Sequence, residues 1–229
     1  MGTQVIDIEV VSDRTAESRC DEGFLHLRRL LVRNRRADGT VSEVYPVDVV
    51  DRPQLDAVAV VVWRRGATGQ VEVLLRQTLR PAALLRRDRN PPLPDPRPYL
   101  ALYEIVAGVL EAEDRGEAGL RARAAAECWE EAGLKVHPEE VELLGAPFFV
   151  APGILSEKIF LTAVDAGRRA LQPPPGDGSP LEESGALRWM ALDEAIRCCV
   201  AGEIEDAKTE IGLRRLAEAL PGGGRPLIA

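Results

Sequence analysis

The chain has 229 residues, of which 45% are apolar and 29% are charged, so it holds enough apolar surface to offset the entropy lost on ordering and is not wholly disordered. Its longest apolar run, residues 57–63, is far shorter than the ~20 residues of a membrane-spanning helix. The formal net charge of −8 repels a phosphate backbone, so we expect no nucleic-acid partner, and we expect no membrane partner either.

The N-terminal part of the chain predicts a small β unit. Residues 21–55 alternate between apolar and polar side chains and contain a strong turn signal, Asp38-Gly39. The pattern predicts antiparallel strands at about residues 24–32 and 41–50, with little core of their own. Such a unit usually packs against another domain or subunit. We therefore predict an N-terminal β domain over residues 1–55 and a larger domain over residues 56–229.

The larger domain is predicted to begin with two buried strands. They correspond to β-branched runs at residues 57–62 and 71–75, with a turn at residues 67–69 between them. Residues 86–98 follow, and their five prolines exclude a helix or an inner strand. This stretch is therefore predicted to be a long loop, and loops of such length in compact regions are often functional.

The remaining sequence alternates short strands with helices. A helix is predicted at about residues 120–132, ending at Gly133, and the acidic stretch 107–119 before it is predicted to be a loop. A second loop is predicted at residues 172–180 because it is rich in proline and glycine. Further strands are predicted at residues 103–106, 141–144, 148–150, 159–164 and 186–191, and further helices at residues 193–201 and 207–220.

The cysteines indicate the redox environment. They show neither metal-site spacing nor a disulfide framework, and they are Cys20, Cys128, Cys198 and Cys199. The first residues lack the basic and apolar segments of a secretion signal. These features predict a reducing, cytoplasmic location.

Three glutamates on the predicted helix form the most informative cluster. Glu127, Glu130 and Glu131 stand at i, i+3 and i+4, which places their carboxylates on one helical face. Like charges at these spacings cost a few tenths of a kcal/mol per pair, about 0.2–0.5. Carboxylate oxygens suit Mg²⁺ or Mn²⁺ better than Zn²⁺, which prefers His or Cys. The spacing alone therefore indicates either a solvated acidic face or a divalent-cation site.

The order of residues around this helix resembles the Nudix hydrolase signature, G-x5-E-x7-R-E-U-x-E-E-x-G-U. The matching residues are Gly108, Glu117, Glu127, Cys128, Glu130, Glu131, Gly133 and Leu134. In two respects the chain departs from the signature: Ala126 stands where the family has Arg, and four extra residues lie between Gly108 and Glu127. Arg123, one turn before Glu127, is a candidate substitute for the missing Arg.

Four other stretches resemble the branch of this family that acts on ADP-ribose and nucleoside diphosphate sugars. They occur in the branch's order, and the resemblance covers about residues 24–220. The stretches are LRQTLRP at 75–81, YEIVAG at 103–108, APGILSE at 151–157 and GEIEDAKT at 202–209.

This resemblance implies an α/β (α+β) fold, namely a Nudix α/β/α sandwich with a small N-terminal antiparallel β domain that is swapped within a homodimer. It implies Mg²⁺ as the cofactor, with Mn²⁺ as a substitute, bound by the Ala107 carbonyl, Glu127, Glu130 and Glu131. The implied catalytic residues are Glu183 or Glu182 as the general base, together with Glu130. The implied substrate-binding residues are Arg76, Arg80, Glu104, Gly108, Pro152, Gly153 and Glu157.

The activity implied by the resemblance is hydrolysis of the diphosphate bond of a nucleoside diphosphate sugar. ADP-ribose is the first candidate, and its products would be AMP and ribose 5-phosphate. One alternative is the same chemistry on UDP-glucose or GDP-mannose. The other is a Nudix fold that senses a nucleotide sugar without cutting it. Ala126 supports the sensor, whereas retention of all three helix glutamates supports the enzyme.

Overall fold

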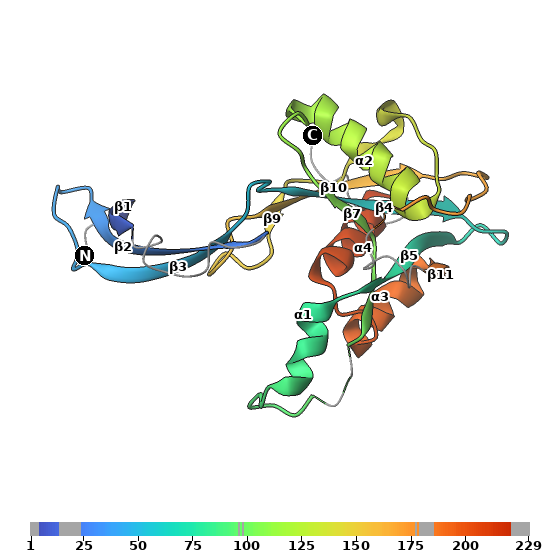
Figure 1. Cartoon of the computed structure of the whole chain (residues 1–229). Helices are drawn as coiled ribbons and strands as arrows, with labels where there is room; N and C mark the ends of the chain where they lie inside the picture. The colour runs from blue at the N-terminus through green and yellow to red at the C-terminus, as the bar shows by residue number, and fades with distance from the viewer. Residues whose placement is uncertain are drawn as a thin grey trace. The chain divides into compact units, whose positions relative to one another are not determined.

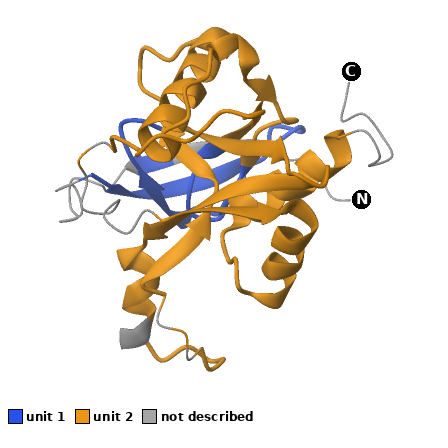
Figure 2. Cartoon of the chain, turned by 90° about the vertical axis from the view of Figure 1, so that its right-hand side faces the viewer, with its two compact units in different colours: residues 1–55, 149–158 blue, residues 56–148, 159–229 orange. Residues whose placement is uncertain are grey.

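The computed structural model describes residues 5–13, 24–95, 97, 99–176, 178 and 186–220. The chain forms two compact units, which Figure 2 colours separately: residues 1–55 with 149–158, and residues 56–148 with 159–229. The segment 149–158 thus groups with the smaller unit, whereas the predicted larger domain spans residues 56–229.

The smaller unit contains a 3-stranded antiparallel sheet in the order β1-β2-β3. Its strands are β1 (Val5–Asp13), β2 (His26–Arg36) and β3 (Tyr45–Asp51). As predicted, the chain turns between β2 and β3 at Asp38-Gly39, where Gly39 has a φ of 83° that favours glycine. Strand β1 was not predicted, and it pairs along β2 from outside the stretch that showed a hairpin pattern.

A mixed, 8-stranded sheet forms the centre of the larger unit, with β11-β5-β4-β10-β8 as its main order. Along this path β4 and β10 pair in parallel, while β5, β8 and β11 run antiparallel to their neighbours. The strands of this path are β4 (Ala57–Arg65), β5 (Val71–Leu79), β8 (Glu142–Leu143), β10 (Lys158–Asp165) and β11 (Leu187–Ala191); the short strand β9 (Phe148–Phe149) precedes β10.

One predicted strand is in fact two. Where residues 103–106 were expected to form a single strand, β6 (Ala101–Glu104) pairs with β5 and β7 (Val106–Val109) pairs with β4. Between them, the Ile105 N–H donates to Thr209 Oγ1 at 2.9 Å instead of to a strand. A contact with the last helix therefore decides the break, and the local pattern of residues could not show it.

Helices cover both faces of this sheet (Figure 1). Helix α2 (Gly116–Ala132) lies on one face, and α3 (Leu192–Ala201) and α4 (Ala207–Ala219) lie on the other. Alternate residues of β4 enter two separate apolar clusters, as the two-residue period of a strand requires. Val58, Val60 and Val62 pack with Leu120, Ala124 and Cys128 of α2, whereas Ala57, Ala59 and Val61 pack with Leu213 and Leu216 of α4. The larger unit is thus an α/β/α sandwich, as predicted.

The excursion between β5 and β6 is partly helical. It begins with α1 (Pro81–Leu84) and the 3₁₀ turn η2 (Leu85–Asp88), so helical turns reach into the predicted loop at residues 86–98. Pro81 occupies a first-turn position, where its missing N–H costs nothing. The ends of the excursion meet, because the Arg80 N–H donates to the Leu100 carbonyl at 3.2 Å.

One end of α2 and one end of α4 lie where the sequence indicates. Gly133 terminates α2 with a φ of 62°, and its N–H donates to the Trp129 carbonyl at 3.0 Å. Helix α2 starts at Gly116, earlier than the predicted residue 120. Asp206 caps the start of α4 by accepting the Thr209 N–H at 3.0 Å. No helix in the described ranges is long and apolar enough to cross a membrane.

Candidate functional site

Helix α2 holds its glutamates close to the sheet. Leu120, Ala124 and Cys128 recur every four residues and are buried in the cluster beneath the helix. Glu127 and Glu131 flank this stripe, so Glu127 is 8% exposed and the Glu131 side chain is 14% exposed. The amphipathic pattern of α2 therefore removes both carboxylates from bulk solvent.

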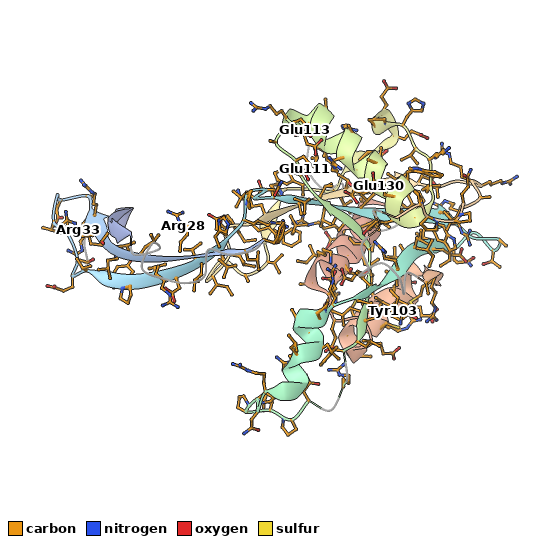
Figure 3. All side chains as sticks on the ribbon, viewed as in Figure 1. Arg28, Arg33, Tyr103, Glu111, Glu113 and Glu130 are labelled. Carbon is orange, nitrogen blue, oxygen red and sulfur yellow. The ribbon has the colours of Figure 1, made fainter. Side chains whose placement is uncertain are left out.

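A cavity of about 400 Å³ lies between α2 and β7. It brings together all three predicted metal-binding glutamates with the predicted Ala107 and Gly108. Figure 3 labels two of the acidic residues of its wall, Glu130 on α2 and Glu111 in the loop before the helix. The complete lining is Ala107, Gly108, Val109, Glu111, Arg123, Glu127, Glu130 and Glu131. Four carboxylates and one guanidinium give this cavity a strongly negative charge.

Gly108 permits the close approach of α2 to β7. A Cβ at this position would lie 1.7 Å from Glu127 Oε1 and 2.0 Å from Glu127 Cδ, inside any allowed contact. The Glu127 carboxylate therefore rests on the face of Gly108, where only glycine leaves room.

Glu131 is held from two strands. The Ala107 N–H on β7 donates to Glu131 Oε2 at 3.0 Å. On the other side, the Arg76 guanidinium on β5 forms an ion pair with Glu131 Oε1, and Arg76 is only 4% exposed. Arg76 is predicted to bind substrate; of the two partners, Glu131 lines the cavity and Arg76 does not.

Asp114 is a site residue that the sequence analysis missed. It stands six residues after Gly108, the spacing of the first acid in the signature, whereas Glu117 was matched to that position. Asp114 Oδ2 accepts hydrogen bonds from Arg123 Nε at 2.8 Å and from the Glu111 N–H at 2.9 Å. The Glu117 side chain is 58% exposed and pairs within its own helix. The four extra residues of this chain therefore lie between Asp114 and Glu127. The six-residue spacing from Gly108 was the sequence signal that could have identified Asp114.

Arg123 stands beside Glu127, as predicted for a substitute of the missing Arg. Its Nη1 lies 3.9 Å from Glu127 Oε1 while its Nε is bound to Asp114. The hydrogen bond to Asp114 raises the pKa of Arg123. Burial pushes the pKa of Asp114 upward, but the hydrogen bond and charge of Arg123 outweigh burial and lower that pKa. Both groups therefore stay ionised, and Asp114 holds Arg123 against the acidic wall.

Glu104 and Arg80, both predicted to bind substrate, bind each other. Arg80 donates from Nε and Nη2 to the two carboxylate oxygens of Glu104, each at 2.6 Å, and Lys208 Nζ donates to Oε2 at 2.6 Å. Burial pushes the pKa of Glu104 up, yet the hydrogen bond from Arg80 and the charge of Lys208 lower it overall. The hydrogen bond to Glu104 raises the pKa of Arg80. Three stretches of the family resemblance therefore meet at one buried carboxylate.

The other predicted substrate residues belong to the smaller unit. Pro152 and Gly153 are exposed in a turn that the Ile154 N–H closes by donating to the Ala151 carbonyl at 3.0 Å. Glu157 forms an ion pair with Arg52 and lines a cavity of about 230 Å³ within that unit. The predicted general bases Glu182 and Glu183 lie outside the described residues.

Cys128 is no candidate nucleophile. It is fully buried in the apolar cluster beneath α2. Burial, followed by the charges of Glu127 and Glu131, raises the pKa of its thiol far above the usual range. The thiolate needed for nucleophilic chemistry is therefore absent at neutral pH.

Whether the cavity suits a divalent cation depends on which of its atoms can coordinate one. Within the described part of the chain, no three His, Cys, Asp or Glu side chains are gathered closely enough to hold a metal ion as placed. Glu131 turns to Arg76 instead, and Glu127 lies near Arg123. The donors nevertheless suit Mg²⁺, because they are carboxylate oxygens around one cavity. In an antiparallel strand the N–H and C=O of one residue point to the same edge of the strand. The Ala107 carbonyl therefore lies on the edge of β7 from which the Ala107 N–H binds Glu131.

Comparison with known proteins identifies the fold. No protein-family model and no curated protein matches the sequence. A solved structure described as "Crystal structure of ADP compounds hydrolase" is similar, with a TM-score of 0.58 and 14% sequence identity. The match covers 98% of this chain and 97% of that one. At this identity the likeness shows a Nudix-type fold.

Proposed function

We propose that the chain hydrolyses the diphosphate bond of a nucleoside diphosphate sugar, ADP-ribose in the first place, to give AMP and ribose 5-phosphate. The observation that supports this proposal is the acidic cavity in which Glu127, Glu130 and Glu131 face Ala107 and Gly108. The likeness of the fold to an ADP compounds hydrolase supports the substrate class.

Mg²⁺, or Mn²⁺ in its place, would be held by the Ala107 carbonyl, Glu127, Glu130 and Glu131. When bound, such an ion neutralises the diphosphate and lowers the pKa of a bound water. The chain supplies the geometry: the Ala107 N–H orients Glu131, and Gly108 lets Glu127 approach β7. Glu183, with Glu182 second, is proposed as the general base, and Glu130 supports catalysis from the cavity wall.

Arg80 is proposed to bind the phosphates or the terminal sugar. Its side chain is 42% exposed, and its contacts with Glu104 use Nε and Nη2. A guanidinium has five N–H donors, so Nη1 and one hydrogen of Nη2 can reach an oxygen of the substrate. Glu104 thus presents Arg80 in a fixed orientation.

The smaller unit is proposed to complete the substrate site in a homodimer. Pro152, Gly153 and Glu157 belong to this unit, and Pro152 and Gly153 are exposed in their turn. We expect the chain to elute as a dimer in size-exclusion chromatography with light scattering. A monomer that turns over ADP-ribose at full rate would contradict the shared site.

A substrate panel tests the proposed reaction. ADP-ribose, UDP-glucose, GDP-mannose and a dinucleoside polyphosphate are each incubated with Mg²⁺ or Mn²⁺, and products are separated by ion-exchange chromatography. We expect the highest kcat/KM for ADP-ribose and release of AMP. Faster turnover of UDP-glucose or GDP-mannose assigns the substrate to the alternative class.

Glu127→Gln separates the enzyme from the sensor. We expect kcat to fall at least about a hundredfold, because a carboxylate of the cavity is lost. Glu210→Gln is the matched control, since Glu210 is 38% exposed and pairs with Arg214 within α4. If the wild-type protein binds ADP-ribose but releases no AMP with either metal, the sensor is correct.

A further inference from the structure

Arg76 carries its charge inside the larger unit. It lies on β5 between two strands, opposite Leu187 of β11 and Glu104 of β6. Leu74, two residues earlier, packs in the cluster beneath α2, and residues two apart on a strand share a face. Arg76 therefore points toward α2, where its Nη1 meets Glu131 Oε1.

This ion pair lies away from bulk solvent. The Arg76 guanidinium is only 4% exposed. Glu131 is also largely buried, with its side chain 14% exposed. Removing one member of such a pair leaves an uncompensated charge in a poorly solvated place. The loss of Arg76 therefore removes a positive charge from beside Glu131.

Carboxylates outnumber guanidiniums around the cavity. The lining holds four carboxylates and the Arg123 guanidinium. Arg76 does not line the cavity, but its ion pair with Glu131 places a second positive charge next to the lining. With Asp114, which binds Arg123, the described residues bring together five carboxylates and two guanidiniums, an excess of three negative charges. Without Arg76 the excess would be four, and the helix glutamates would repel one another more strongly.

We propose that Arg76 is a positioning residue and resident counter-charge for Glu131, in place of the predicted substrate contact. It keeps the carboxylate cluster stable without a divalent cation, and it weakens the affinity of the cluster for that cation. The second statement rests on the proposed function, because it requires that the cluster binds a divalent cation. Both follow from Coulomb's law, since a neighbouring positive charge stabilises the carboxylate and repels an incoming cation.

The test compares wild type with Arg76→Gln in thermal unfolding, with and without MnCl₂. Without Mn²⁺ we expect the variant to have a Tm lower by roughly 10 °C, because Glu131 has lost its counter-charge. Saturating Mn²⁺ should close most of this gap, since the ion replaces the missing charge and stabilises the folded state by linkage. The Kd for Mn²⁺, measured by electron paramagnetic resonance without nucleotide, should become about tenfold tighter.

Three further variants keep the result interpretable. Arg64→Gln is the matched control, because Arg64 Nε binds Glu72 at 2.8 Å on a neighbouring strand, and its effect should not depend on Mn²⁺. Arg76→Lys keeps a positive charge and should retain a Kd for Mn²⁺ near that of wild type. If Arg76→Gln does not fold without Mn²⁺, the double variant Arg76→Gln/Glu131→Gln should fold, because both charges of the pair are then gone.

Three results would contradict the inference, and they differ in whether the proposed function also fails. If Mn²⁺ stabilises the wild type but the gap for Arg76→Gln stays open, Arg76 is only structural, and this inference fails while the proposed function stands. If AMP binding without metal weakens about tenfold in Arg76→Gln and the Kd for Mn²⁺ is unchanged, Arg76 is a substrate contact and the inference is again wrong. If Mn²⁺ binds neither protein, the proposed function fails together with the inference.

Discussion

The larger unit holds two buried carboxylate sites that differ in their charge balance. At the first, Glu104 and Asp206 face Arg80 and Lys208, so two negative charges meet two positive ones. At the second, the cavity beside α2, the carboxylates outnumber the guanidiniums that contact them. At the first site the positive and negative charges balance. At the second site the excess of carboxylates can attract a cation.

The comparison shows that burial of a carboxylate does not by itself indicate a functional site. Glu104 is the more buried, at 2%, yet its oxygens are bound by Arg80 and Lys208. Glu131 is less buried and lines a cavity of about 400 Å³. What distinguishes the sites is the excess of carboxylates around a cavity, where an opposite charge is attracted.

The largest effect that we expect at the balanced site is on stability. Glu104→Ala leaves Arg80 and Lys208 without their common partner, so the free energy of unfolding in urea should fall by about 3–5 kcal/mol. Mn²⁺ should not restore this loss, because the missing group is an anion. Exposed Glu210→Ala is the control and should change stability by about 0.5 kcal/mol or less. Restoration of Glu104→Ala by Mn²⁺ would remove the distinction between the two sites.

Gly108→Ala should damage the acidic cavity without unfolding the chain. The new Cβ would displace the Glu127 carboxylate, which is the flexible end of a side chain, so the backbone can stay in place. We expect kcat for the preferred substrate to fall about a hundredfold, the upper range for a disturbed ligand, with Tm lowered by only a few degrees, about 2–4 °C. A variant with normal turnover would show that the position of Glu127 is unimportant.

Arg123 and Asp114 should act as one unit on the acidic wall. Arg123→Gln is expected to reduce kcat about tenfold, because Glu127 loses the neighbouring charge. Asp114→Asn should have a smaller effect, and the double variant should be no worse than Arg123→Gln alone. Fully additive losses in kcat would indicate that Asp114 does not work through Arg123.

The smallest expected effect is on the pH dependence of stability. The pKa of Glu104 is lower in the folded chain, so its stabilisation is complete above the unfolded value of about 4.3. It is lost as pH falls through that value toward the folded pKa. Urea unfolding between about pH 5 and pH 3 should therefore show a shallower pH slope in Glu104→Gln than in wild type. Equal slopes in the two proteins would contradict the lowered pKa of Glu104.

Parts of this site were predictable because they depend on local spacing. The positions of Glu127, Glu130 and Glu131 on one helix follow from a period of 3.6 residues, and the end of α2 follows from Gly133. Their approach to Ala107 and Gly108 was implied by the family resemblance. By contrast, the partner of Arg76 could not be predicted, because its strand and α2 meet only through packing.

The sequence by itself determined most of the strands, the amphipathic helix with its acidic side and the glycine that ends this helix, since each depends on residues a few positions apart. It determined neither β1 nor the break between β6 and β7. The tertiary structure decided which cation meets which carboxylate. Arg80 and Glu104 are 24 residues apart, and Glu104 and Lys208 are 104 apart. Such pairings are set by how the strands and helices pack, because Coulomb interactions depend on distance in space and not along the chain.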